Sequence, residues 1–181
     1  MRILSIILMS ALMWMGCENK ATSPGVSDSE ILIGDIQDLS GPIKELGLLL
    51  PAGTNMYLDY INSQGGIHNR QIKLLVEDHG YNPQKAVVAA KKLIEKDQVF
   101  CLYNVIGTSA AEAIRPILEE SGVPLIAPAT NSSTLSDMSR QAAQYIFHTD
   151  AGYDLQTRVL IEYILENNKD AVIGLAYQDD N

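Results

Sequence analysis

The sequence predicts an α/β fold built on a parallel β-sheet. From Glu30 onward, short β-rich runs alternate with segments of helical period, and this alternation is typical of successive β-α-β units. About 150 residues follow the N-terminal segments described below, which is enough for a domain with a buried core. We therefore expect strands joined by crossover helices.

The first half of this pattern supplies two strands and two helices. Residues 31–36 and 71–77 are expected strands, and residues 52–63 form a helix that Gly65-Gly66 ends. The next helix begins at Asn82-Pro83, because proline is tolerated in a first helical turn. The residues expected to face the core from these two helices are Ala52, Met56, Tyr57, Tyr60 and Ile61, then Ala86, Val87, Ala90, Leu93 and Ile94.

The second half is expected to hold four strands and two helices. The strands are residues 99–104, 124–127, 144–148 and 171–177, and the helices are residues 109–120 and 153–167. Cys101 lies inside an apolar run, which favours a small core residue over a reactive thiol. The residues expected to face the core from the first of these helices are Ala110, Ala113, Ile114, Ile117 and Leu118.

Polar loops are expected at the carboxyl ends of the strands, where open parallel sheets bind ligands. Residues 38–46, 107–109 and 128–134 are such loops. Gly107, Thr108 and Ser109 place backbone N–H groups and two hydroxyls beside the positive end of a helix, which favours an anion. The loop that holds Ala129, Thr130 and Asn131 repeats this arrangement, so the pair suits a small carboxylate. Helix capping is the alternative explanation of either loop.

Composition and motifs argue against other classes of function. The net charge of −9 makes nucleic acid an unexpected partner. Glycine-rich nucleotide fingerprints and a catalytic set are absent from the sequence. His68, His79 and His148 lack metal-ligand spacing and are expected at the surface or at an edge, and Glu77-Asp78 is expected to be solvated charge. We therefore expect no enzyme activity, no cofactor and no metal.

The first 17 residues read as an export signal. Arg2 precedes an apolar run at residues 3–15, and Gly16 and Cys17 follow. The run is too short to cross a bilayer, which needs about 20 apolar residues. Its end resembles the lipobox of bacterial lipoproteins, so Cys17 is the expected site of a lipid anchor, although an ordinary signal peptide cut nearby is the alternative. Residues 18–29 are expected to be a flexible tether.

Several short motifs occur in one order along the chain, and together they resemble a known family. They are Ile33-Gly34, Leu39-Ser40-Gly41-Pro42, residues 61–67, Val76-Glu77-Asp78, residues 82–86 and residues 122–129. They are similar to the extracytoplasmic solute-binding proteins of ABC transporters, in the branched-chain amino acid group with the type I periplasmic-binding fold.

This resemblance implies two α/β lobes that close on a ligand about a hinge. Residues 30–149 would form a first lobe of three layers, and residues 150–181 only the start of a second. Proteins of this family usually run to more than twice this length. A last helix and strand without the rest of that lobe would expose an apolar face.

The resemblance also implies a ligand site. Thr108 and Ser109 would bind the α-carboxylate of an amino acid, and Ala129, Thr130 and Asn131 would contact both of its charged groups. Leu46 stands where leucine/isoleucine/valine binders carry an aromatic residue over the ligand side chain. Tyr81 stands at one position of a disulfide found in some members.

The implied function is capture of a branched-chain amino acid, or a similar small amino acid or carboxylate, and its delivery to an ABC permease in a bacterial membrane. The binding protein would act in the periplasm or at the cell surface. A ligand-sensing domain of a signalling receptor with the same fold is the alternative. An enzyme on a flavodoxin-like scaffold is a third reading, which would need a cofactor fingerprint or a catalytic set.

Overall fold

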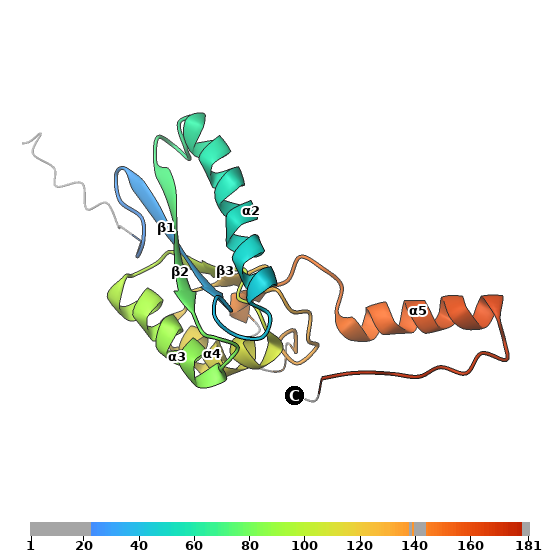
Figure 1. Cartoon of the computed structure of the whole chain (residues 1–181). Helices are drawn as coiled ribbons and strands as arrows, with labels where there is room; N and C mark the ends of the chain where they lie inside the picture. The colour runs from blue at the N-terminus through green and yellow to red at the C-terminus, as the bar shows by residue number, and fades with distance from the viewer. Residues whose placement is uncertain (1–22, 138, 140–143, 179–181) are drawn as a thin grey trace, which may run out of the picture.

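The computed structural model describes residues 23–137, 139 and 144–178, and a parallel sheet lies at its centre (Figure 1). Within these residues the sheet has five strands in the order β2-β1-β3-β4-β5, and every neighbouring pair is parallel. The strands are β1 (Glu30–Gln37), β2 (Gln71–Asp78), β3 (Cys101–Tyr103), β4 (Leu125–Ile126) and β5 (Ile146–Phe147). The predicted parallel α/β lobe is therefore confirmed.

Helices cover both faces of this sheet (Figure 1). Helix α2 (Lys44–Ser63) lies over one face. Helices α3 (Pro83–Lys91) and α4 (Thr108–Ser121) pack together over the other, and α3 continues into the π-helical turn η2 (Lys92–Lys96). These are the three layers that the sequence predicts.

The hydrophobic core lies between the sheet and the α3/α4 layer. Side chains alternate across a strand, so Ile36 and Leu102 enter this core while Ile33 and Tyr103 face the α2 side. Fully burying a side chain such as Leu93, Ile114 or Leu118 contributes about 1.5–3 kcal/mol. The predicted core residues that are buried are Ala86, Ala90, Leu93, Ile94, Ala110, Ile114, Ile117 and Leu118.

Cys101 is also buried, as predicted. Its exposed fraction is 4%, and burial raises the pKa of its thiol to about 11. The thiolate is the reactive form of cysteine, so this residue packs as a small apolar side chain.

Helix α2 differs from the sequence prediction in length and in orientation. It begins at Lys44 rather than at residue 52. Pro51 lies inside the helix, where it removes one backbone hydrogen bond but does not end the helix. The stripe expected to face the core is largely exposed, with Met56 at 76% and Tyr57 at 64%. Among the described residues, nothing covers this side of α2, since both other long helices of the lobe lie on the opposite face of the sheet.

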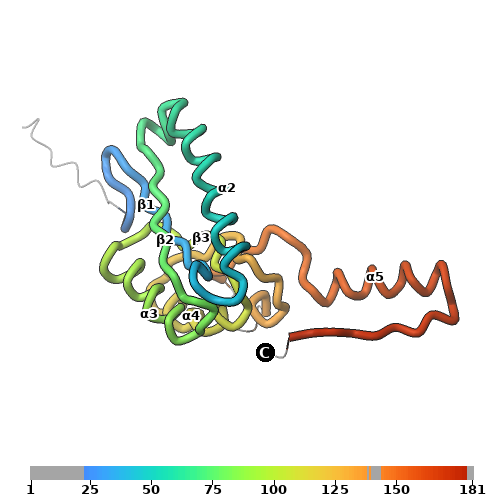
Figure 2. The backbone as a smooth tube through the Cα atoms, in the orientation of Figure 1, coloured from blue at the N-terminus to red at the C-terminus, as the bar shows by residue number. Residues whose placement is uncertain are grey.

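The predicted sixth strand does not form. Residues 171–178 are extended and run back along α5 (Tyr153–Asn167) without a strand partner among the described residues (Figure 2). A strand needs a neighbour to satisfy its backbone groups, and Val172 is fully exposed.

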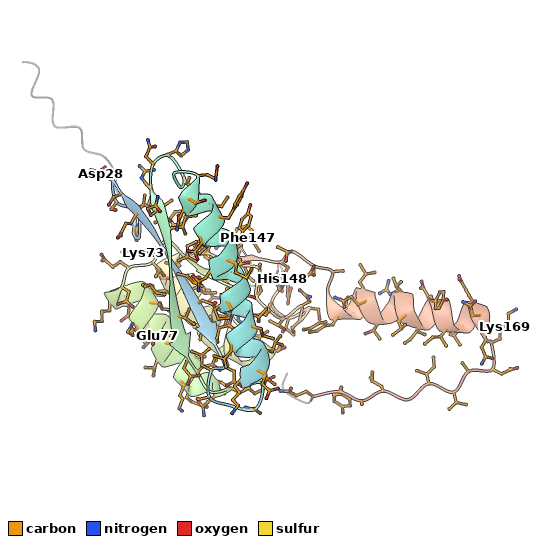
Figure 3. All side chains as sticks on the ribbon, turned by 45° about the horizontal axis from the view of Figure 1, so that its top comes forward. Asp28, Lys73, Glu77, Phe147, His148 and Lys169 are labelled. Atoms are coloured by element: carbon orange, nitrogen blue, oxygen red, sulfur yellow. The ribbon has the colours of Figure 1, made fainter. Side chains whose placement is uncertain are left out.

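Helix α5 buries none of its residues. It extends away from the lobe and carries side chains on all of its sides, and the labelled Lys169 lies just beyond its end (Figure 3). The exposed apolar residues Val159, Leu160 and Tyr163 agree with the apolar face expected for this last segment. In the part of the chain that the structure describes, no helix has the length and apolarity to span a membrane.

The end of the expected flexible tether is held against the sheet, so that prediction is wrong for residues 23–29. Val26 bridges to Ile31, and the Arg70 Nε atom donates to the Ser27 carbonyl at 2.8 Å. Gly25 has a φ of +71°, and a Cβ there would lie 2.1 Å from the Phe100 nitrogen, so only glycine fits. The export signal, Cys17 and the first part of the tether lie outside the described residues.

Candidate ligand-binding site

A cavity of about 380 Å³ opens where the strand order reverses, beyond the carboxyl ends of β1 and β3. The chain leaves β1 for β2 on one side and returns to β3 on the other, so the loops after β1 and β3 diverge and leave a crevice. Ile43 and Leu46 line it from the loop after β1 and the first turn of α2. Tyr81 lines it from the turn after β2.

The polar side of the cavity comes from the loops after β3 and β4. Gly107, Thr108 and Ala129 line it here. A parallel bridge between Ile106 and Ala129 continues the β3–β4 pairing into both loops. The hydroxyls of Thr108 and Thr130 are 2.7 Å apart and share a hydrogen bond. Two loops that are 22 residues apart are thereby fixed against each other at one edge of the cavity.

The N-terminus of α4 faces this cavity through Thr108. Gly107 precedes the helix with a φ of +94°, and no side chain caps the helix there. The first N–H groups of a helix lack partners within it, and the helix dipole adds partial positive charge. This end of α4 suits a carboxylate. The alternative explanation of this loop is helix capping, but none of its side chains forms a capping hydrogen bond at the start of α4.

The structure brings four of the predicted site residues together at the cavity: Leu46, Gly107, Thr108 and Ala129. Thr130 is buried at 2% exposure and supports Thr108 from behind. Ser109 is half-buried in the first turn of α4. Asn131 is half-buried, and its carbonyl accepts from the Tyr153 N–H at 2.9 Å. Their contacts with a ligand stay predictions.

Sequence reasoning missed the aromatic part of this cavity. Tyr81, Tyr153 and Tyr177 line it, together with Ile43, Ile106 and Gln178. Tyr81 lies three residues after β2, a strand of the same sheet, so the rule used for the other loops would have selected it. Tyr153 carried no such signal. Tyr177 ends the expected strand 171–177, but that strand does not form, and only the path of the chain after β5 brings both tyrosines to the cavity.

The sequence predicts His79 at the surface or at an edge. It directly follows the edge strand β2, but it is completely buried, so the surface position is wrong. Burial lowers the pKa of His79, and the carboxylates of Asp38 and Asp78 and the Ile106 backbone oppose that shift. The Asp38 carboxylate accepts the Gly41 and Ile43 N–H groups at 2.5 and 2.8 Å. It thereby fixes the loop that carries Ile43 into the cavity.

Asp78 is exposed, as the prediction of solvated charge implies, and Glu77 is half-buried, but both carboxylates also have structural partners. Lys92 Nζ lies 2.6 Å from Glu77 Oε1. The Asp78 carboxylate accepts the Leu39 and Gly80 N–H groups at 2.9 Å and the Ser40 hydroxyl at 2.6 Å. It ties the loop after β1 to the turn that carries Tyr81. Burial alone would raise the pKa of Asp78, but these donors and His79 lower it overall.

Replacing Asp78 by asparagine is expected to lower the free energy of unfolding by about 1–2 kcal/mol at pH 7, because hydrogen bonds to a charged acceptor are lost. The Asp78 pKa is lower in the folded chain than the ordinary 3.8, so its stabilising contribution is present above that value and is lost as the pH falls below it. Urea denaturation at pH 7 and pH 3 tests this. The same deficit at both pH values would contradict the ionic origin.

Among the residues that the structure describes, no group of three His, Cys, Asp or Glu side chains could hold a metal ion. None of the described residues that line the cavity has a charged side chain. Hydroxyls, backbone N–H groups, a helix end and aromatic rings are therefore the means of recognition that it offers.

Comparisons with known proteins agree with this geometry. A family model described as periplasmic binding protein matches residues 30–181. The Leu/Ile/Val-binding protein homolog 3 of Brucella melitensis is 26% identical over 149 residues, which cover 82% of this chain and 39% of that protein. The chain therefore spans about two fifths of the length of this curated relative.

Solved structures show the same lobe. A possible leucine/isoleucine/valine-binding protein from Rhodopirellula baltica superposes with a TM-score of 0.71 at 20% identity, over 83% of this chain and 38% of that one. A fatty acid ABC transporter substrate-binding protein from Thermomonospora curvata superposes with a TM-score of 0.70 at 27% identity, over 81% and 36%.

Proposed function

Because this chain belongs to the periplasmic binding protein family, we propose that it forms the first lobe of an extracytoplasmic receptor for a small amino acid or related carboxylate. The receptor delivers its ligand to an ABC permease. The observation that carries the proposal is the Thr108–Thr130 pair at the N-terminus of α4, on the edge of the cavity at the switch point of the sheet.

The names of the relatives support a carboxylate ligand. The Brucella melitensis protein is a Leu/Ile/Val-binding protein homolog, and the Thermomonospora curvata structure is a fatty acid ABC transporter substrate-binding protein. Branched-chain amino acids and fatty acids share a carboxylate joined to an apolar group. The cavity offers both counterparts, since the end of α4 suits an anion while Ile43, Leu46 and Tyr81 supply apolar walls.

In this proposal Thr108 and Ser109 bind the carboxylate at the end of α4. Ala129, Thr130 and Asn131 supply backbone and side-chain contacts to the charged groups of the ligand. Leu46 lies beside its apolar part. The rings of Tyr153 and Tyr177 are the proposed partners of an α-ammonium, because a cation is attracted to an aromatic face.

The test is calorimetric titration of the whole mature protein with L-leucine, L-isoleucine, L-valine and short-chain fatty acids. The double variant T108A/N131A is expected to lose affinity by about 1–3 kcal/mol for each lost hydrogen bond to a charged group, which is about 5- to 150-fold per bond.

The variant S121A is the matched control, because it removes an exposed hydroxyl at the opposite end of α4. It should bind as the wild type does. A folded wild-type protein that binds none of these compounds would contradict the proposed ligand class. Unchanged affinity in T108A/N131A would show that these two side chains do not hold the ligand.

A further inference from the structure

We propose that Tyr81 is a positioning residue, which holds the Gly107–Thr108 turn in the conformation that receives the ligand carboxylate. The inference rests on the proposed function, because it assigns a role within the same site. Tyr81 reaches the cavity from the turn after β2, whereas Gly107 and Thr108 come from the loop after β3.

The contact between Tyr81 and Gly107 is direct. A Cβ built on Gly107 would lie 3.2 Å from Tyr81 Cε2, and 3.8 Å from Cδ2 and Cζ of the same ring. The tyrosine ring therefore occupies the space that a side chain at position 107 would need. Glycine at 107 permits two things at once, the φ of +94° before α4 and the close approach of an aromatic ring to the backbone.

The backbone of Tyr81 is itself unusual. Its φ is +58°, directly after Gly80 at +53°. A bulky residue in the left-handed region is uncommon and costs about 1–2 kcal/mol. The turn is closed by a hydrogen bond from the Asn82 N–H to the His79 carbonyl at 2.9 Å. Glycine or asparagine would fit this turn without that cost, so the contacts of the tyrosine side chain are what offset it.

The ring is held from a second side as well. The centroids of the Tyr81 and His79 rings are 6.2 Å apart at an interplanar angle of 31°, and His79 is completely buried. The Tyr81 hydroxyl also donates to Gln178 Oε1 at 3.2 Å. Tyr81 thus lies beside the buried His79 ring and beside Gly107, and its hydroxyl is bonded to Gln178.

The consequence concerns the cost of binding. A turn that contains glycine loses more backbone entropy on ordering than any other, and a ligand that must order its site loses that free energy from its affinity. A ring fixed against Gly107 orders the turn before the ligand arrives. The N–H groups at the start of α4 then need no rearrangement to meet a carboxylate.

The experiment compares the whole mature wild-type protein with Y81F, Y81N, G107A and Y81N/G107A, by calorimetric titration with L-leucine and L-alanine. Y81N removes the ring but suits the left-handed backbone, so it separates the ring from folding. We expect the affinity of Y81F to lie within threefold of that of the wild type. We expect the affinity of Y81N to fall at least tenfold, and to fall by the same factor for both amino acids.

The wild type, Y81N, G107A and Y81N/G107A form a double-mutant cycle, which gives a second readout. An alanine at position 107 clashes with the ring of Tyr81 only while that ring is present, so the losses from Y81N and G107A should be less than additive in the double variant. The matched control is Y60A, because Tyr60 is an exposed tyrosine on α2. It should bind as the wild type does.

Each remaining outcome overturns the inference in a distinct way. If the wild type binds and Y81N binds equally well, Tyr81 does not position the turn, while the proposed function stands. If Y81N loses affinity for L-leucine alone, the ring contacts the ligand side chain instead. If the wild type binds neither probe nor any other carboxylate, the inference fails together with the proposed function.

Discussion

Replacing Gly47 by alanine is expected to lower the free energy of unfolding by about 3 kcal/mol or more, because overpacking against backbone leaves nothing that can move aside. A Cβ at position 47 would lie 2.0 Å from the Asp38 carbonyl oxygen and 2.7 Å from its carbonyl carbon. Asp38 is completely buried, and its carboxylate already holds the Gly41 and Ile43 N–H groups. The loop after β1 and the start of α2 must therefore separate.

The matched control for G47A is G53A in the same helix. Apart from the adjacent residues and the backbone of the helix itself, no atom of the described residues lies within 4 Å of a Cβ built at Gly53. Alanine there should therefore stabilise the chain by about 0.5–1 kcal/mol, the gain expected from helix propensity. Urea denaturation followed by circular dichroism measures both variants. Similar stability in G47A and G53A would contradict the close contact between Gly47 and Asp38.

Replacing Asp35 by asparagine is expected to stabilise the folded chain by about 2–4 kcal/mol at pH 8. Asp35 is completely buried in β1, and desolvation raises its pKa from 3.8 to about 7, although the Gln37 side chain and the Ile36 backbone oppose the shift. The Gln37 Nε2 atom donates to Asp35 Oδ1 at 2.6 Å. Asp35 Oδ2 has no hydrogen-bond partner among the described residues. A shift of about three units corresponds to roughly 4 kcal/mol.

The sign of the pH dependence follows from this shift. The Asp35 carboxyl binds its proton more tightly in the folded chain than in the unfolded chain, so its ionisation opposes folding. The opposing contribution is absent below about pH 4, grows as the pH rises to about 7, and is constant above that. The free energy of unfolding of the wild type should therefore fall between about pH 4 and pH 7. D35N should not show the part of this fall that comes from the ionisation of Asp35.

Urea denaturation of both proteins from pH 4 to pH 8 tests the prediction. The variant D59N controls for the loss of one negative charge, because Asp59 is exposed on α2. It should change the free energy of unfolding by less than about 0.5 kcal/mol. A gain in D35N that is the same at pH 4 and pH 8 would contradict an origin in the ionisation of Asp35.

The elements that the sequence predicted best are those with a complete local signal. Helix α3 with its continuation η2, and helix α4, each carry an apolar stripe at helical spacing, and Leu93, Ile114 and Leu118 are fully buried as expected. Helix α2 carries a similar stripe, yet Tyr57 and Tyr60 are exposed. A stripe shows that one side of a helix can be buried. Whether it is buried depends on what lies over it, which is not a local property.

The candidate site shows the same division. Thr108 and Ala129 could be selected from the sequence, because each follows a strand of a parallel sheet. The burial of Thr130 behind Thr108 could not be predicted, since it depends on the register between two loops. The contact of Tyr81 with Gly107 could not be predicted either, because it depends on β1 lying between β2 and β3 in the sheet.

The sequence by itself determined the alternation of strands and helices, the parallel sheet, the family, and the loops that carry hydroxyls and glycine. Each of these features depends on residues that are close together in the sequence. The tertiary structure alone decided which of those loops meet at one cavity, that His79 is buried, that the stripe of α2 is exposed, and that Tyr81 packs on Gly107. Contacts between distant segments depend on strand order and register, which the local pattern of side chains does not encode.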